Sequence, residues 1–294
     1  MISILILYTL LTSLVFMQAN LMQQAVFPLF ITVFRELIGA GVLFVLHLVW
    51  SRSSIFLQLS KKQWSSLIKF SLMLYGVSLV GFSYAMQYVD GVTACFVLTG
   101  LPFITALILY VKESQTLSTK KLIGLGLGFL GILPIIVKEN ATSLLSMEYK
   151  IWGMVLFLGA TVAHAYGWIL GNECKKQLQG QSQLLITAWA MCISGIISYF
   201  GYILLQGNFA PIGASIYFWQ LLWVFSLVTA VAYYLYMYLL QYYSVTFLSF
   251  ASFTEPAIGL LIGVVLYNQP ITFLSGASLA LLSLGLYIFY QDEL

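Results

Sequence analysis

The sequence contains few charged residues. Of its 294 residues, 12 are Lys or Arg and 9 are Asp or Glu, which together make up 7% of the chain, whereas an average soluble domain is about 25% charged. So few ionised side chains cannot solvate the surface of a soluble protein of this length, and 61% of the residues are hydrophobic. The composition excludes a soluble enzyme and a nucleic-acid-binding protein. It predicts an integral membrane protein that has the lipid bilayer as a partner.

Cysteine is also scarce. Cys95, Cys174 and Cys192 form no CxxC pair and lie in or at the ends of apolar runs, so they predict neither a disulfide framework nor a metal site. We interpret them as small packing residues. The sequence contains no recognisable nucleotide-binding loop, metal-ligand cluster or nucleophile triad. It therefore indicates no cofactor, no metal and no catalytic residue.

Long apolar runs fill most of the chain instead. They predict an all-α polytopic membrane protein with ten transmembrane helices and little room for a soluble domain. Strands of a membrane barrel are disfavoured because the runs are continuously apolar rather than alternating. The expected helices cover residues 2–20, 27–50, 64–88, 91–111, 120–138, 149–172, 183–206, 216–241, 246–267 and 271–290.

The basic residues are distributed unequally between the two sides of the membrane. If ten helices alternate in direction, nine of the twelve fall on one side, Lys138 and Lys150 fall on the other, and Arg35 lies within a span. Because Lys and Arg are enriched in cytoplasmic loops, both termini are predicted to be cytoplasmic. The expected location is the plasma membrane, which is the inner membrane in a Gram-negative bacterium. The nine residues are Arg52, Lys61, Lys62, Lys69, Lys112, Lys120, Lys121, Lys175 and Lys176.

Two segments of the chain resemble each other. Residues 84–102 and 238–256 align without a gap at an offset of 154. The alignment predicts two five-helix halves, residues 1–140 and 141–294. Because five is odd, the halves must cross the membrane in opposite directions, and such inverted repeats are typical of alternating-access carriers. The matched pairs are Tyr84 and Tyr238, Gln87 and Gln241, Tyr88 and Tyr242, Phe96 and Phe250, and Pro102 and Pro256.

Several short motifs resemble the drug/metabolite transporter superfamily, specifically the ten-helix carriers of the EamA type. The resemblance covers nearly the whole chain, and its motifs are specific in combination. The sequence departs from the family pattern where Asn268 and Gln269 replace the usual Glu after the ninth span, and where Pro102 and Glu113 are about two residues too close. The resemblance implies a carrier of small organic metabolites. Its motifs are Phe34-Arg35-Glu36-Leu37, the Tyr-Ala-x-Gln-Tyr stretch at 84–88, Leu101-Pro102-Phe103 leading to Glu113, and Glu255-Pro256 leading to Gly276.

Glu255 is the first candidate for a transport site. An ionisable group at membrane depth costs about 2.5–3.5 kcal/mol on the insertion scale, so each one suggests a function. Glu255 lies near the middle of the ninth predicted span, before Pro256. The missing N–H of that proline predicts a free backbone carbonyl one turn earlier. The carboxylate could exchange a proton or pair with a substrate cation, and the structural alternative is a clasp with another side chain.

Arg35 and Glu36 form the second candidate. Neighbouring helical residues point about 100° apart, so the two side chains cannot face one partner. We expect one of them to line a cavity and the other to reach the membrane interface or another helix. The structural alternative places Arg35 at the outer headgroups and pairs Glu36 with another helix.

Histidine and aromatic side chains supply the remaining candidates. His164 lies deep in the sixth span, four residues before Trp168, and could relay protons. A neutral histidine bonded to an adjacent helix is the alternative. Tyr84 and Tyr238 recur in both halves, so we expect some of these rings to line a cavity that stacks on an organic substrate.

These features predict a secondary active transporter. It would move a small organic metabolite, such as an amino acid or related solute, by efflux or exchange through alternating access. An intramembrane enzyme acting on lipid or prenyl substrates is the alternative. Such enzymes tend to carry Asp-rich metal motifs, and Asp90 is the only aspartate before the C-terminal tail. The sequence leaves a homodimer open.

Overall fold

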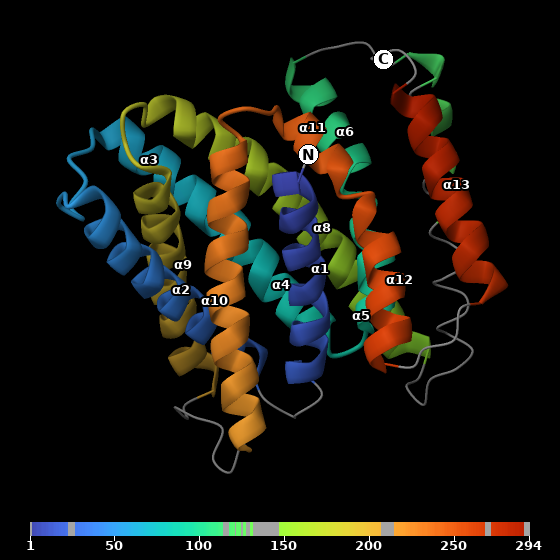
Figure 1. The fold of residues 1–294 in the computed structure, drawn as a ribbon, viewed down its shortest axis with the longest axis horizontal. Helices are drawn as coiled ribbons and strands as arrows, with labels where there is room; N and C mark the ends of the chain where they lie inside the picture. The colour runs from blue at the N-terminus through green and yellow to red at the C-terminus, as the bar shows by residue number, and fades with distance from the viewer. Residues whose placement is uncertain are drawn as a thin grey trace.

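The computed structural model describes residues 2–22, 27–113, 118–120, 122–124, 126–127, 130–131, 147–206, 215–267 and 272–290. Every regular element within these ranges is a helix. Eight helical stretches of the described chain are long and apolar enough to cross a membrane. The predicted all-helical, multi-pass architecture is therefore confirmed, and Figure 1 shows that α1 begins and α13 ends near the same end of the bundle.

Five of the eight stretches are single helices, and three are composite. The single helices are α1 (Ile2–Met22), α2 (Pro28–Ser51), α8 (Met147–Gln177), α9 (Gln183–Gln206) and α10 (Ile216–Leu239). The composite stretches are α3 (Lys61–Phe70) with the π-helix η1 (Ser71–Ser78) and α4 (Leu79–Ala85), α5 (Gly91–Leu98) with α6 (Leu101–Glu113), and α11 (Val245–Ala251) with α12 (Thr254–Tyr267). Helix α13 (Phe273–Tyr290) corresponds to the last predicted span. Most of the span predicted at 120–138 lies outside the described residues.

Two of the composite stretches, α5–α6 and α11–α12, are interrupted by a two-residue turn. Both of these stretches begin with the same kind of cap. The Asp90 carboxylate accepts hydrogen bonds from the backbone N–H groups of Val92 and Thr93, at 2.8 and 3.0 Å. The Ser244 hydroxyl accepts one from the N–H of Phe247 at 3.1 Å. Such caps satisfy N–H groups that have no partner inside the helix. Asp90 and Ser244 occupy matching positions at the offset of 154, so the local fold recurs where the sequence does.

Pro102 and Pro256 lie in the first turns of α6 and α12. A proline there costs no intrahelical hydrogen bond, because the first N–H groups of a helix have no acceptor. The predicted free carbonyl before Pro256 is wrong, since the carbonyl of Ser252 accepts the N–H of Glu255 at 2.8 Å. The reason is that the span is interrupted before α12 and does not run straight through the proline.

Helix α8 packs closely against the composite span α3–η1–α4. At Gly167 on α8, an added Cβ would lie 2.7 Å from the Cα of Leu74 and 2.9 Å from its backbone N. The absence of a side chain at Gly167 therefore lets the backbone of α8 meet that of η1. This contact brings residues of α8 and α4 to one side of the bundle interior.

Lysines at the ends of α6 and α8 join these helices to their neighbours. Lys112 at the end of α6 forms an ion pair with Glu173 near the end of α8. Lys175 donates to the carbonyl of Leu240, just after α10. These contacts place the ends of α6, α8 and α10 together.

Candidate functional site

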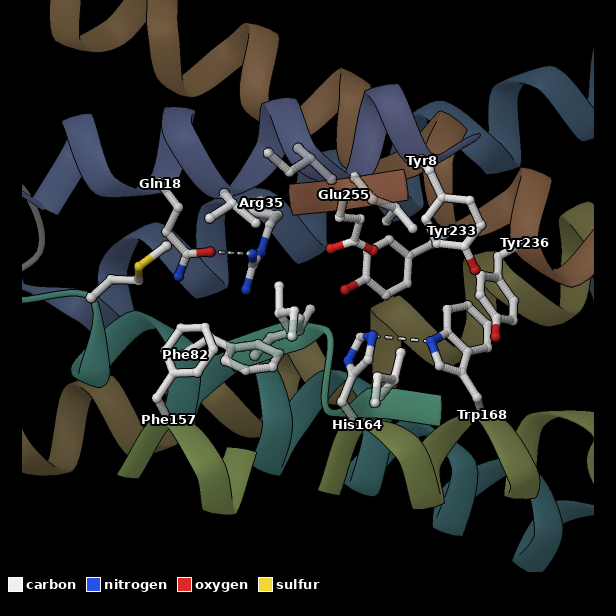
Figure 2. Close-up of a pocket in the computed structure, with 17 residues that line it drawn as sticks. Tyr8, Gln18, Arg35, Phe82, Phe157, His164, Trp168, Tyr233, Tyr236 and Glu255 are labelled. Carbon is white, nitrogen blue, oxygen red and sulfur yellow. Dashed lines mark hydrogen bonds between the residues drawn. The ribbon is translucent and has the colours of Figure 1, made fainter. Parts of the chain in front are cut away.

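A small cavity lies at the centre of the bundle, between helices that belong to the beginning, middle and end of the chain. Its volume is about 60 Å³, and it is lined by side chains of α1, α2, α4, α5, α6, α8, α10 and α12 and by Met86. We call it the central cavity. Figure 2 shows Arg35 and Glu255 on one side of it, and Phe82, Phe157, His164 and Trp168 on the opposite side.

Arg35 supplies the positive charge of the central cavity. It lies on α2 and is only 2% exposed. Its guanidinium lies over the ring of Phe225, 5.1 Å from the ring centroid, a distance at which a cation and an aromatic face attract each other. Nη1 donates to Oε1 of Gln18 at 3.3 Å, whereas Nε and Nη2 have no hydrogen-bond partner. Unused donors of a buried guanidinium are well suited to bind an anionic group.

A chain of hydrogen bonds holds the partner of Arg35 in place. Gln18 donates from Nε2 to Oγ of Ser83 at 2.9 Å, and Ser83 lies 2.7 Å from Oγ1 of Thr32. Thr32 donates to the carbonyl of Pro28, so Ser83 donates to Thr32. The amide of Gln18 consequently presents its oxygen to the arginine. This chain joins α1, α2 and α4 beside the central cavity.

Glu255 supplies the carboxyl group of the central cavity. It lies in the first turn of α12, where the helix dipole favours a carboxylate. The residue is 4% exposed, and its Oε2 has no hydrogen-bond partner. No ion pair joins it to Arg35 among the residues described. The central cavity thus holds a guanidinium and a carboxyl group that form no ion pair with each other.

His164 is held in one neutral form by its neighbours. The indole N–H of Trp168 donates to Nε2 at 3.0 Å, and an indole can only donate. Nε2 must therefore be unprotonated, and Nδ1 carries the hydrogen that is donated to Oγ of Ser78, 3.1 Å away on η1. The structure thus places His164 in the predicted alternative, a histidine bonded to an adjacent helix. Its proton-relay role stays a prediction.

Aromatic rings form one wall of the central cavity. Trp168 stacks on Tyr236 with ring centroids 3.6 Å apart and an interplanar angle of 15°. Trp168 also stacks on Tyr233, with ring centroids 5.5 Å apart and an interplanar angle of 27°. Stacked rings of this kind offer a flat apolar surface with polar edges.

The structure brings together four of the residues predicted for the site and places the other four elsewhere. Arg35, His164, Trp168 and Glu255 line the central cavity, whereas Glu36, Pro256, Tyr84 and Tyr238 are absent from its lining.

Tyr84 packs against the buried cluster formed by Leu29, Val33 and Tyr202. Tyr238 is 38% exposed and its hydroxyl lies 3.1 Å from that of Tyr242. Glu36 lies fully buried beyond the cavity and close to α9. Arg35 is buried too, which differs from the alternative that placed it at the headgroups.

Tyr8 and Gln18 are polar lining residues of α1 that were not predicted. Tyr8 donates to the carbonyl of Leu248 and thereby connects α1 to α11. The signal that could have indicated Gln18 is its amide inside an otherwise apolar first run. Among the residues described, no group of three or more His, Cys, Asp or Glu could hold a metal ion.

Opposite buried charges in a cavity between apolar helices are characteristic of membrane transporters. The chain belongs to the EamA-like transporter family, whose sequence model matches residues 1–137 and 151–291. The predicted resemblance to this family is confirmed. The chain is a multi-pass integral membrane protein and a transporter of the family, not an enzyme, so the alternative of an intramembrane enzyme is set aside.

Known proteins resemble the chain over most of its length. It is 28% identical over 278 residues to S-adenosylmethionine/S-adenosylhomocysteine transporters of Chlamydia trachomatis serovars L2 and D, covering 92% of this chain and 83% of each relative. The corresponding transporter of Chlamydia muridarum is also 28% identical, with 92% and 85% coverage. A solved crystal structure has a TM-score of 0.70 at 16% identity, covers 98% of this chain, and shows the same fold. Together with the family, these relatives indicate that the chain transports a small metabolite.

Proposed function

We propose that this protein transports S-adenosylmethionine, S-adenosylhomocysteine or a close analogue across the plasma membrane. The observation that carries this proposal is that Arg35 and Glu255 line one buried cavity, each with polar atoms that have no hydrogen-bond partner. The names of the relatives add the chemical class, an amino acid joined to an adenosyl group. The predicted amino-acid-like substrate is thereby narrowed to one that also carries an aromatic base.

The charges and rings of the central cavity match the parts of such a substrate. The substrate carboxylate would accept hydrogen bonds from the free donors of Arg35. The positively charged sulfonium of S-adenosylmethionine would face Glu255. The adenine ring would stack on the wall that contains Trp168 and Tyr236. Specificity would come from a few polar groups in a mainly apolar site, as is usual for small-molecule pockets.

Transport would proceed by alternating access between two inverted halves, residues 1–140 and 141–294, with ten helices and both termini in the cytoplasm. Three observations support this arrangement. The caps Asp90 and Ser244 recur at the repeat offset, the family model matches two successive ranges, and the central cavity takes Arg35 from one half and Glu255 from the other. The cavity of about 60 Å³ is far smaller than the roughly 300–1,000 Å³ of ordinary ligand pockets. The halves must therefore move apart to admit a substrate.

Counterflow tests the substrate directly. Purified protein in liposomes preloaded with unlabelled S-adenosylmethionine should transiently accumulate the labelled compound from outside. Excess external S-adenosylhomocysteine should compete with the label, whereas methionine alone should compete weakly because it lacks the adenosyl group. Absence of accumulation with both adenosyl compounds, in liposomes that contain correctly folded protein, would refute the proposal.

Glu255→Gln should separate the two adenosyl substrates. The sulfonium has no N–H or O–H to donate, so Glu255 would attract it by charge alone. Close buried charge pairs contribute about 1.5–7 kcal/mol, so S-adenosylmethionine counterflow should fall at least roughly 10-fold. S-adenosylhomocysteine has a neutral thioether in place of the sulfonium, so its counterflow should fall much less. The matched control is Glu173→Gln, because Glu173 is an exposed carboxylate of the surface ion pair with Lys112.

Equal losses for both substrates would contradict the pairing of Glu255 with the sulfonium. If Glu255 exchanges a proton, as the sequence also suggests, the variant should instead change the pH dependence of counterflow for both compounds. Running each variant across a pH series therefore distinguishes the two roles.

A further inference from the structure

A second polar cluster lies outside the lining of the central cavity, where α2, η1 and α9 pack together. It consists of Glu36 on α2, Tyr75 on η1 and Ser194 on α9, and we call it the Glu36 cluster. Glu36 and Tyr75 are fully buried, and so is Ser194. Both carboxyl oxygens of Glu36, the hydroxyl of Tyr75 and the hydroxyl of Ser194 lack a hydrogen bond of standard geometry. Four unpartnered buried polar atoms at one place are unusual, because such groups are nearly always satisfied.

The Glu36 cluster lies outside the lining of the central cavity, because none of its three residues belongs to that lining. A Cβ added at Gly195 on α9 would lie 3.2 Å from the Cβ of Glu36, so α9 packs closely against α2 at this residue. An ionised carboxylate buried without donors is strongly disfavoured. A carboxyl group in this setting needs either a counter-charge or a proton.

The counter-charge available to Glu36 is its neighbour Arg35. The charged and titratable groups that interact with Glu36 come from three packed elements: Arg35 on α2, Tyr75 on η1 and Tyr233 on α10. From α9 it meets Ser194, which does not titrate at physiological pH. Arg35 is the only cation in this set. The charge on Glu36 therefore depends on what else neutralises Arg35.

We propose that the Glu36 cluster is a proton-binding site coupled to the substrate through Arg35. With the central cavity empty, Arg35 and an ionised Glu36 neutralise each other. When a substrate carboxylate binds Arg35, a second anion beside the same cation is unfavourable, so Glu36 takes a proton from water. The new O–H bond can donate to Ser194 or Tyr75. The proton leaves when the substrate leaves.

The geometry of η1 is consistent with this role. Tyr75 lies in the π-helix, and π-helical turns occur frequently at functional sites. Coupling of this kind is reciprocal: if substrate binding raises the affinity for a proton, a lower pH must raise the affinity for the substrate. This inference rests on the proposed function in one respect, the binding of a substrate carboxylate by Arg35.

Infrared difference spectroscopy tests the proton site without any substrate. As the pH is lowered, the wild-type protein should gain the carbonyl-stretch band of a protonated carboxylic acid, and Glu36→Gln should lack one component of it. Arg35→Gln should gain that component at a higher pH, because the cation that stabilises the ionised form is gone. The matched control Glu173→Gln, which removes an exposed carboxylate, should keep the component. An unchanged band in Glu36→Gln would overturn the proton site.

Proton uptake on binding tests the coupling. In weakly buffered detergent solution with a pH indicator, S-adenosylmethionine should cause uptake of up to about one proton per bound molecule. The decarboxylated analogue of S-adenosylmethionine should cause no proton uptake. Glu36→Gln should abolish the uptake caused by S-adenosylmethionine, and calorimetry should measure the affinity of this variant for S-adenosylmethionine separately. Binding without uptake in the wild type would overturn the coupling. Failure of the wild type to bind S-adenosylmethionine would instead refute the proposed function, and the infrared result would still decide the role of Glu36.

Discussion

Arg35→Ala should nearly abolish counterflow of S-adenosylmethionine. Truncating one member of a buried charge pair costs about 2–5 kcal/mol, which corresponds to a roughly 30-fold to several-thousand-fold loss of affinity. The loss should lie toward the upper end, because Arg35 is 2% exposed and two of its donor atoms have no partner that could replace the substrate. S-adenosylhomocysteine should lose as much, since it has the same carboxylate.

Arg35→Lys separates charge from geometry. Lysine keeps the positive charge but cannot present the planar fork that binds a carboxylate through two parallel bonds. The S-adenosylmethionine counterflow of Arg35→Lys should therefore lie between those of the wild type and Arg35→Ala. Thermal unfolding in detergent checks that each variant is folded. Wild-type counterflow by a folded Arg35→Ala protein would contradict the assignment of Arg35 to the substrate carboxylate.

Gly167→Ala should destabilise the protein severely. The new Cβ would lie 2.7 Å from the Cα of Leu74, and a backbone atom cannot move aside as the end of a side chain can. Overpacking costs about 1–3 kcal/mol and occasionally more, and a collision with backbone belongs at the high end. The measurement is the unfolding temperature of the purified protein, together with the yield of monodisperse protein.

The same helix offers a matched control for this substitution. At Gly159 on α8, an added Cβ would meet nothing within 4 Å. Alanine is favoured over glycine within a helix by about 0.5–1 kcal/mol, so Gly159→Ala should leave the unfolding temperature unchanged or raise it. Equal behaviour of the two variants would show that the contact between α8 and η1 does not limit stability.

The spans could be predicted from the sequence because their length is set by the bilayer. A run of about 20 apolar residues has few other uses, and eight of the predicted spans correspond to membrane-length helices among the described residues. The interruptions between α5 and α6 and between α11 and α12 could not be predicted this way. No charged residue lies within the links at 99–100 and 252–253. The nearby prolines misled because a proline within a run and one in a first turn look alike in sequence.

The candidate site was predictable only where burial itself is costly. Arg35 and Glu255 were found because charge at membrane depth requires a reason. Tyr84 and Tyr238 were chosen because they recur, yet an aromatic that recurs in a packed repeat can serve helix packing or the lipid face equally well. The direction in which the Glu36 side chain points could not be predicted from the sequence either. It depends on which side of α2 meets α9, and this is set by tertiary packing.

The π-helix η1 also determines how the span that contains it would respond to the deletion of one residue. A π turn contains one residue more than an α turn. The extra residue is therefore accommodated within the turn, and α3 and α4 keep nearly the relative orientation that an uninterrupted α-helix would give them. Deleting one residue between Phe70 and Leu79 would let the segment wind as an ordinary α-helix and should leave Leu79 and Phe82 facing the central cavity. A single-codon deletion in this segment should thus disturb the cavity far less than one in the regular part of a span, which would rotate everything beyond it by about 100°.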